Sequence, residues 1–79
     1  MNEAHEQIDH NRLFEASEAV LDAISELAAA HGGLCPYPTS VMGTSEQPDC
    51  LARFTRWEIE EATRFLMRAG FIEAQSLEG

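Results

Sequence analysis

The sequence predicts a mainly α-helical domain with two main helices, a short helical turn and one or two short β-strands. Two stretches carry apolar residues at helical spacing, about residues 11–31 and residues 56–69. Between them, residues 32–50 hold all three prolines and three of the five glycines, a composition typical of loops. A chain of 79 residues suits one domain with a single core. We therefore expect residues 11–79 to form one domain and residues 1–10 to be a flexible polar leader.

The first helix is predicted from a single apolar stripe. Its members recur at steps of seven, four and three residues, with two further apolar residues alongside: Leu13, Val20, Ile24 and Leu27, then Leu21 and Ala28. Asp9 or Asn11 can cap its start. Gly32 and Gly33 are expected to end it, because glycine reaches the left-handed conformation without a steric penalty.

The opposite face of this predicted helix carries a column of acids. They follow one another at steps of three, four and four residues: Glu15, Glu18, Asp22 and Glu26. Like charges at this spacing cost roughly 0.2–0.5 kcal/mol per pair, and the chain contains no lysine to offset them. Two interpretations stay open, a solvated face or a negative stripe that docks on a basic partner.

The central residues are expected to form only short elements. Leu34 and Cys35 can make a very short strand. One helical turn is expected from Thr39 to Met42, with Thr39 or Ser40 as its cap. Residues 43–49 are expected to be an exposed loop.

The start of the second helix is strongly specified. Thr55 and Glu58 have the spacing of a capping box, in which each side chain bonds the backbone amide of the other residue. Phe54 before the cap and Ile59 at the fourth helical position can form a hydrophobic staple. We therefore expect this helix to begin at residue 56.

The end of the second helix is also marked. An apolar face runs along it: Ile59, Ala62, Phe65, Leu66 and Ala69. Gly70 is expected to stop the helix, and Phe71 can fold back onto Leu66 as in a Schellman motif. Residues 71–76 can then make one short strand, whose edges could pair with the Leu34 strand or with a second copy of the chain.

The outward face of the second helix combines arginines, acids and a tryptophan: Arg56, Trp57, Glu60, Glu61, Arg64 and Arg68. The arginines could read guanine in a DNA major groove. They could equally pair within the helix, as Glu60 with Arg64 and Glu61 with Arg64. Trp57 is either a protein-binding hot spot beside arginines or a residue packed against the loop at residues 43–52.

This order of elements resembles a winged helix-turn-helix domain over about residues 12–75. The residues that carry the resemblance lie in both helices and in the connector: Val20, Leu21, Asp22, Ala23, Ile24, Pro36, Pro38, Glu60, Ala62, Phe65, Leu66, Ala69, Gly70, Phe71 and Ile72. The family's wing is a β-hairpin, whereas the residues after the second helix leave room for one strand. In residues 51–70, four arginines against three glutamates leave a net charge of only +1. Both departures count against the family's usual DNA binding.

The sequence contains no supported catalytic, cofactor or metal site. No phosphate-binding glycine loop or nucleophile elbow occurs, and the three histidines have no metal-ligand spacing. Cys35 and Cys50 are most simply reduced, partly buried thiols, although a disulfide between them stays open. We therefore expect a protein that is not an enzyme and binds neither cofactor nor metal.

The net charge of −9 bears on localisation and partners. No secretion signal and no long apolar run is present, so we expect a cytoplasmic protein that does not enter a membrane. All five basic residues are arginine, and a chain this acidic is repelled by DNA, so we do not expect direct DNA binding. Whether the chain is a monomer or a homodimer stays open.

By size and charge the chain resembles small acidic phage proteins, a class that includes DNA mimics and anti-CRISPR proteins. The resemblance implies a non-enzymatic protein-binding inhibitor that acts in the cytoplasm of the host cell. Its partner would be a basic nucleic-acid-binding protein or nucleoprotein complex, such as a type I Cascade effector whose binding of target DNA it blocks. The expected contacts are the helix-one acids and a second patch on the other helix: Glu15, Glu18, Asp22 and Glu26, then Trp57, Arg56, Arg64 and Arg68. The alternative is a winged-helix transcription regulator that dimerises and places Arg56, Arg64 and Arg68 in the major groove.

Overall fold

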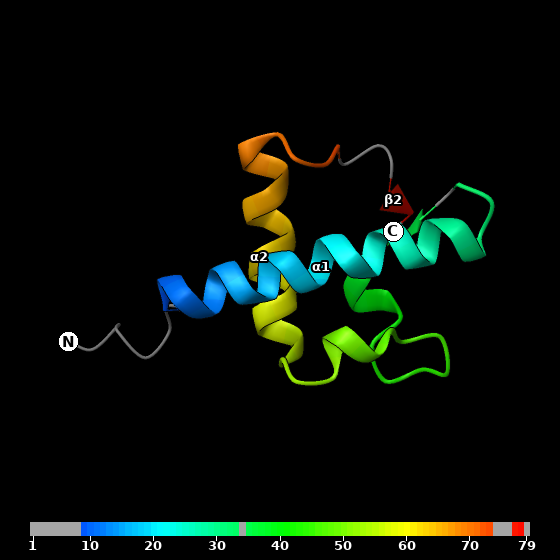
Figure 1. Ribbon diagram of the computed structural model, residues 1–79, viewed down its shortest axis with the longest axis horizontal. Coiled ribbons are helices and arrows are strands. Elements are labelled where there is room, and N and C mark those ends of the chain that lie inside the picture. Colours follow the sequence, from blue (N-terminus) through cyan, green and yellow to red (C-terminus); the bar gives the residue numbers. More distant parts are fainter. Residues whose placement is uncertain (1–8, 34, 74–76, 79) are drawn as a thin grey trace.

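Two helices that cross at a steep angle dominate the fold (Figure 1). The computed structural model describes residues 9–33, 35–73 and 77–78. Its elements in chain order are α1 (His10–Ala30), β1 (Cys35–Pro36), the 3-10 helices η2 (Pro38–Ser40) and η3 (Asp49–Leu51), α2 (Arg56–Ala69) and β2 (Leu77–Glu78). The mainly α-helical prediction is confirmed. The polar leader predicted for residues 1–10 lies outside the described residues, apart from Asp9 and His10, which cap and begin α1.

Both predicted ends of α1 are confirmed. The Asp9 carboxylate accepts a hydrogen bond from the backbone amide of Asn11 at 3.0 Å and so supplies the N-cap. After the helix, Gly32 and Gly33 have φ angles of 70° and 99°. The amide of Gly33 donates to the carbonyl of Ala28 at 2.6 Å, which closes the last turn.

Both ends of α2 carry the capping hydrogen bonds that the sequence predicts. The Thr55 hydroxyl accepts from the Glu58 amide at 3.1 Å, and the Thr55 amide donates to Glu58 Oε1 at 2.9 Å. At the other end Gly70 has φ 85°, and the amide of Phe71 donates to the carbonyl of Leu66 at 2.9 Å. The backbone half of the predicted Schellman motif is present. The Phe71 ring itself is largely exposed.

The main core lies where α1 crosses α2. Its buried members come from both helices and from the segment that precedes α2: Ala16, Ala19, Val20, Ala23, Leu51, Phe54, Ile59, Ala62 and Leu66. Three alanines on the inner face of α1 let α2 approach closely, since the distance between packed helices depends on the side chains between them. The predicted staple residues, Phe54 and Ile59, both lie in this core. Leu21, predicted beside the apolar stripe, is exposed because the buried face turned towards these alanines.

The short central helix, predicted from Thr39 to Met42, begins one residue earlier and ends two residues earlier, at Ser40. It begins at Pro38 with Tyr37 as its N-cap and without a side-chain capping bond, so neither Thr39 nor Ser40 is the cap. Proline suits this position because it has no amide to satisfy. The loop predicted at residues 43–49 is largely exposed, but it leads into η3, a turn that the sequence did not predict.

The two strands lie at other residues than predicted, Cys35–Pro36 and Leu77–Glu78, and they pair with each other. Cys35 lies opposite Leu77 and Pro36 opposite Glu78 in a parallel pair, so the strand after α2 pairs within the chain. Leu34 lies outside the described residues. The strand expected at residues 71–76 is wrong for residues 71–73, which form a bend, and residues 74–76 lie outside the described part.

Candidate protein-binding surface

The acidic column, Glu15, Glu18, Asp22 and Glu26, lies on the exposed side of α1. Glu15 is held by two guanidinium groups, with Arg53 Nη2 at 3.4 Å and Arg12 Nη1 at 3.8 Å from its Oε1. Over the described ranges, the other three carboxylates make no ion pair, and all three are exposed. Their charge is therefore directed to solvent and is available to a partner.

η3 packs against α1 and brings Cys50 and its neighbour Asp49 close to the acidic column. Cys50 packs against α1 and its thiol donates to the carbonyl of Ala19 at 3.4 Å. The pKa of Cys50 is raised, first because burial disfavours the thiolate and then because Asp22, Glu26 and Asp49 are negative. These carboxylates must therefore lie close enough to act on one sulfur atom. Spacing along the chain does not predict that Asp49 lies near these acids, because it is 23 residues beyond Glu26 in a loop.

An arginine near the start of α1 ties the two helices together. Arg12 Nε lies 2.8 Å from Glu58 Oε2, and Arg12 Nη2 lies 3.1 Å from Glu58 Oε1. The same Nη2 donates to the Arg53 carbonyl at 2.8 Å. The Arg12 hydrogen bond is the main cause that lowers the pKa of Glu58, the Thr55 amide adds to it, and burial opposes it. Sequence analysis found the capping role of Glu58 but missed its pairing with Arg12.

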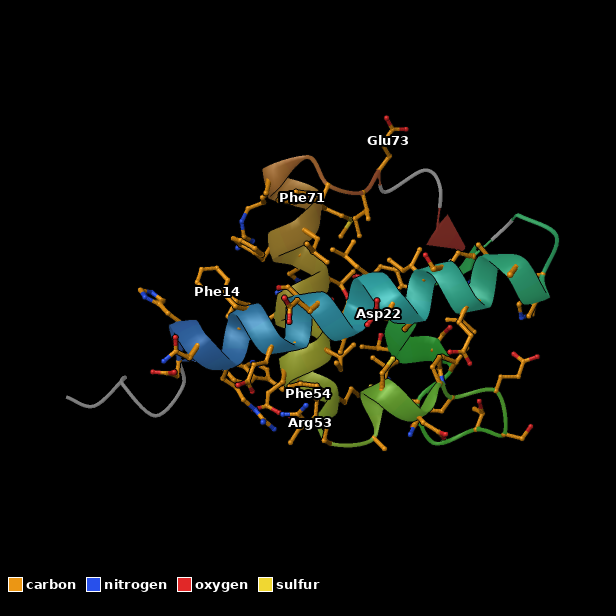
Figure 2. The ribbon with its side chains drawn as sticks, viewed as in Figure 1. Phe14, Asp22, Arg53, Phe54, Phe71 and Glu73 are labelled. Atoms are coloured by element: carbon orange, nitrogen blue, oxygen red, sulfur yellow. The ribbon has the colours of Figure 1, made fainter. Side chains whose placement is uncertain are left out.

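The guanidinium groups of Arg12 and Arg53 also cover the Phe54 ring. Their Cζ atoms lie 4.4 and 5.1 Å from its centroid. Figure 2 shows Arg53 and Phe54 together beside the N-terminal half of α1, and Asp22 further along the helix. Arg53 contacts both Phe54 and Glu15, so the first acid of the column is partly neutralised. The unpaired charge therefore begins at Glu18.

The predicted second patch on α2 is divided by its contacts within the chain. Arg56 Nη1 donates to the carbonyl of Thr39 at 3.0 Å and so holds η2. Glu60 accepts from the hydroxyls of Tyr37 and Thr39, each at 3.3 Å. The pKa of Tyr37 is raised, mainly by burial and then by the charge of Glu60. Arg56 thus has a structural bond that a partner or DNA would have to compete with.

The remaining members of that patch behave in two ways. Arg64 pairs with Glu60 at 3.2 Å and with Glu61 at 3.4 Å, which confirms the predicted pairing within the helix. Arg68 and Trp57 are exposed, and Arg68 makes no ion pair with the part of the chain that is described. The eight predicted site residues therefore form the α1 column and a separate face of α2, on which Arg64 is paired with acids, Arg56 is bonded to a carbonyl and Arg68 is unpaired within the described structure.

Both cysteines are free, Cys35 being buried and Cys50 partly buried. No group of three potential metal ligands occurs within residues 9–33, 35–73 and 77–78. Neither helix in that part of the chain is long and apolar enough to cross a membrane.

Comparisons with known proteins found no matching protein-family model, no similar curated protein and no similar solved structure.

Proposed function

We propose that this protein is a non-enzymatic inhibitor whose acidic column docks on the nucleic-acid-binding surface of a basic partner. The observation that carries the proposal is the exposure of Glu18, Asp22 and Glu26 on successive turns of one helix, without an ion pair to any described residue. The net charge of −9 gives the field a consistent sign. Asp49 extends this negative surface beyond α1.

The charge spacing of the column can be compared with that of DNA. From Glu15 to Glu26 the helix rises about 16 Å, at 1.5 Å per residue, so the four carboxylates lie about 5.5 Å apart along the axis. One DNA strand carries a charge every 3.4 Å or so. The column is sparser by a factor of about 1.6, but it is rigid and has the same sign. An arginine- and lysine-lined path therefore attracts it for the same reason that it attracts a phosphate backbone.

Inhibition in this proposal is competition for one basic path. The column occupies the path, and the folded domain behind it excludes the nucleic acid sterically. Electrostatic steering speeds the encounter and makes it sensitive to salt. The proposed partner is a nucleoprotein complex that must expose such a path to take DNA, a type I Cascade effector of CRISPR defence being the specific candidate. The chain would then belong with the anti-CRISPR proteins.

The test is displacement of fluorescent target DNA from purified type I Cascade. The wild-type protein should lower DNA binding in proportion to its concentration. Asp22→Arg should weaken inhibition by at least about tenfold, since a close opposite-charge contact becomes a repulsive one. Glu46→Arg is the matched control, because it makes the same change in net charge on the exposed loop before η3. The proposal would be overturned if Asp22→Arg and Glu46→Arg lost inhibition equally, or if the wild-type protein did not inhibit DNA binding.

The alternative is a winged-helix transcription regulator. The observation in its favour is the order of elements, in which a helix, a short strand, a helical turn and a second long helix precede a strand. Against it, Arg56 and Arg64 are engaged within the chain and the two strands form a parallel pair. Binding of random duplex DNA at low salt, with affinity that falls steeply as salt rises, would favour the regulator and count against the inhibitor.

A further inference from the structure

Three of the four exposed large apolar side chains in the described part of the chain gather on one flank of the molecule. Phe14, Leu21 and Phe71 are 58%, 37% and 67% exposed. We call these three residues the apolar patch. We propose that the patch is the contact surface of a homodimer, in which it meets the same patch of a second copy about a two-fold axis.

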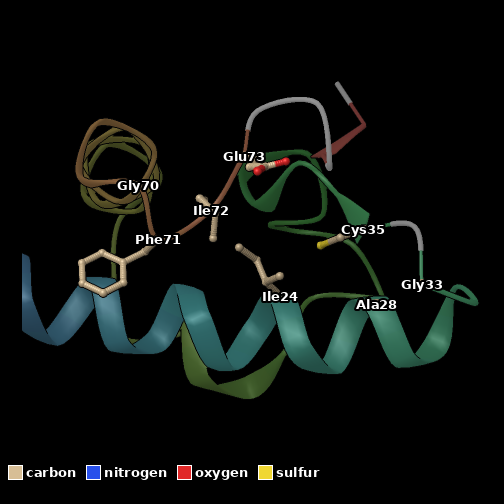
Figure 3. Close-up of a pocket in the computed structure, with 8 residues that line it drawn as sticks. All are labelled: Ile24, Ala28, Gly33, Cys35, Gly70, Phe71, Ile72 and Glu73. Carbon is tan, nitrogen blue, oxygen red and sulfur yellow. The ribbon is translucent and has the colours of Figure 1, made fainter.

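The patch is continuous across several elements. Phe14 and Leu21 are seven residues apart and so lie on the same stripe of α1. Phe14 meets Phe65 of α2 edge-on, with ring centroids 6.4 Å apart. Phe71 lines a cavity of about 340 Å³ together with Ile24, one turn after Leu21. In Figure 3 the Phe71 ring lies towards α1, on the N-terminal side of Ile24.

The distribution of charge favours this flank as the place where a second copy binds. Two chains of net charge −9 repel each other, so they can associate only where acids are few. Glu15 pairs with Arg53, and Figure 2 shows Arg53 and Phe71 on opposite sides of α1, so this part of the acidic column lies away from Phe71. The apolar patch therefore offers a flank on which the surfaces of two copies can meet.

The rim of the patch is complementary to itself. Glu18 lies one turn after Phe14 on α1, and Arg68 lies one turn after Phe65 on α2, and both are exposed. A two-fold axis maps each helix onto its own counterpart, so an axis that passes between Glu18 and Arg68 places Glu18 of each copy beside Arg68 of the other. Arg68 makes no ion pair with any described residue of its own chain, and this arrangement supplies one.

The exposed area sets the expected strength. With about 200 Å² for each large side chain, the exposed fractions leave roughly 300 Å² of apolar surface per copy. A stable standard-size interface buries about 800 Å² per partner, so the rim must contribute and the dimer should be weak. We expect a dissociation constant on the order of 10–100 µM. Asp22 and Glu26 lie outside the apolar patch and stay exposed in such a dimer, which would present these acids of both copies at once.

The test is sedimentation equilibrium of the full chain between about 5 and 500 µM. Phe71→Ser should weaken dimerisation by at least about tenfold, because each substitution enters the interface twice. Trp57→Ser is the matched control, since it removes an exposed aromatic residue outside the patch and should leave the dimer unchanged. Glu18→Arg and Arg68→Glu should each weaken the dimer, and the double variant should regain most of the loss.

The outcomes separate this inference from the inhibitor proposal. A wild-type chain that stays monomeric up to about 500 µM overturns the dimer, as does equal weakening by Trp57→Ser and Phe71→Ser. Failure of the Glu18 and Arg68 double variant to recover overturns the assigned geometry. Asp22→Arg should lose inhibition while it still dimerises, because Asp22 lies outside the patch. If the wild type is monomeric and Phe71→Ser nevertheless loses Cascade inhibition, the dimer is overturned and the apolar patch contacts the inhibited partner instead.

Discussion

Glu58→Ala should destabilise the fold more than any other substitution of a surface carboxylate on α2. The Glu58 side chain is 17% exposed and accepts bonds from Arg12 Nε at 2.8 Å, Arg12 Nη2 at 3.1 Å and the Thr55 amide at 2.9 Å. Loss of the capping bond costs about 1 kcal/mol. Loss of a partly exposed carboxylate pair costs up to about 1 kcal/mol after solvent screening. The expected total is therefore about 2 kcal/mol in the free energy of unfolding.

Urea and thermal unfolding at pH 7, followed by far-UV circular dichroism, measure this difference. For a domain of this size, about 2 kcal/mol corresponds to a fall in Tm of roughly 8–16 °C. Glu61→Ala is the matched control on the same helix, because the one ion pair of Glu61 with a described residue is that with the exposed Arg64 at 3.4 Å, and it should cost less than about 0.5 kcal/mol. A loss from Glu58→Ala no greater than that from Glu61→Ala would refute the reasoning.

The pH dependence gives a second, independent check on Glu58. Its pKa in the folded chain is lowered from the ordinary value of 4.5 by Arg12 and Thr55. A carboxylate with a lowered folded pKa contributes stability above its unfolded pKa and loses that contribution as pH falls through its folded pKa. The difference between wild type and Glu58→Ala should therefore be constant above about pH 5 and shrink below pH 4.5. A difference that stays the same from pH 7 to pH 3 would contradict the proposed pairing.

Three further substitutions test the packing. Ile59→Ala should cost about 2–5 kcal/mol in chemical denaturation, because Ile59 is fully buried where the helices cross, and a loss under 1 kcal/mol would contradict that burial. Ser17→Ala should raise the midpoint of urea unfolding by an amount equivalent to about 1 kcal/mol, since the Ser17 hydroxyl oxygen is buried without a partner in the described structure. Gly70→Ala should lower Tm because alanine is strained at the φ of +85° that residue 70 adopts. A steric clash is not the cause, since a Cβ at this position meets no atom within 4 Å. An unchanged Tm would argue against the left-handed cap.

Sequence analysis predicted best those features that depend on neighbours along the chain. Thr55 and Glu58 are three residues apart, so their reciprocal bonds follow from helix geometry whatever the rest of the fold does. Gly70 ends α2 for an equally local reason, since its φ of 85° is strained for other residues. The exposed acids of α1 belong to the same class, because a step of three or four residues already places them on one face.

Features that bring distant segments together could not be predicted from spacing. Arg12 and Glu58 are 46 residues apart and meet only because α1 crosses the first turn of α2. Asp49 reaches the acidic column only because η3 packs under α1. The exposure of Phe71 depends on how the chain turns after Gly70, which a Schellman hydrogen bond does not set.

The amino-acid sequence by itself therefore determined where the helices begin and end and which of their faces carry charge, because hydrogen bonds and side-chain spacing within a helix span only a few residues. The crossing of α1 over α2 decided the rest. It neutralised Glu15 with Arg53, left the acids from Glu18 onward unpaired within the described structure, and exposed an apolar flank. These outcomes depend on long-range packing, where the position of one helix on another selects which side chains meet.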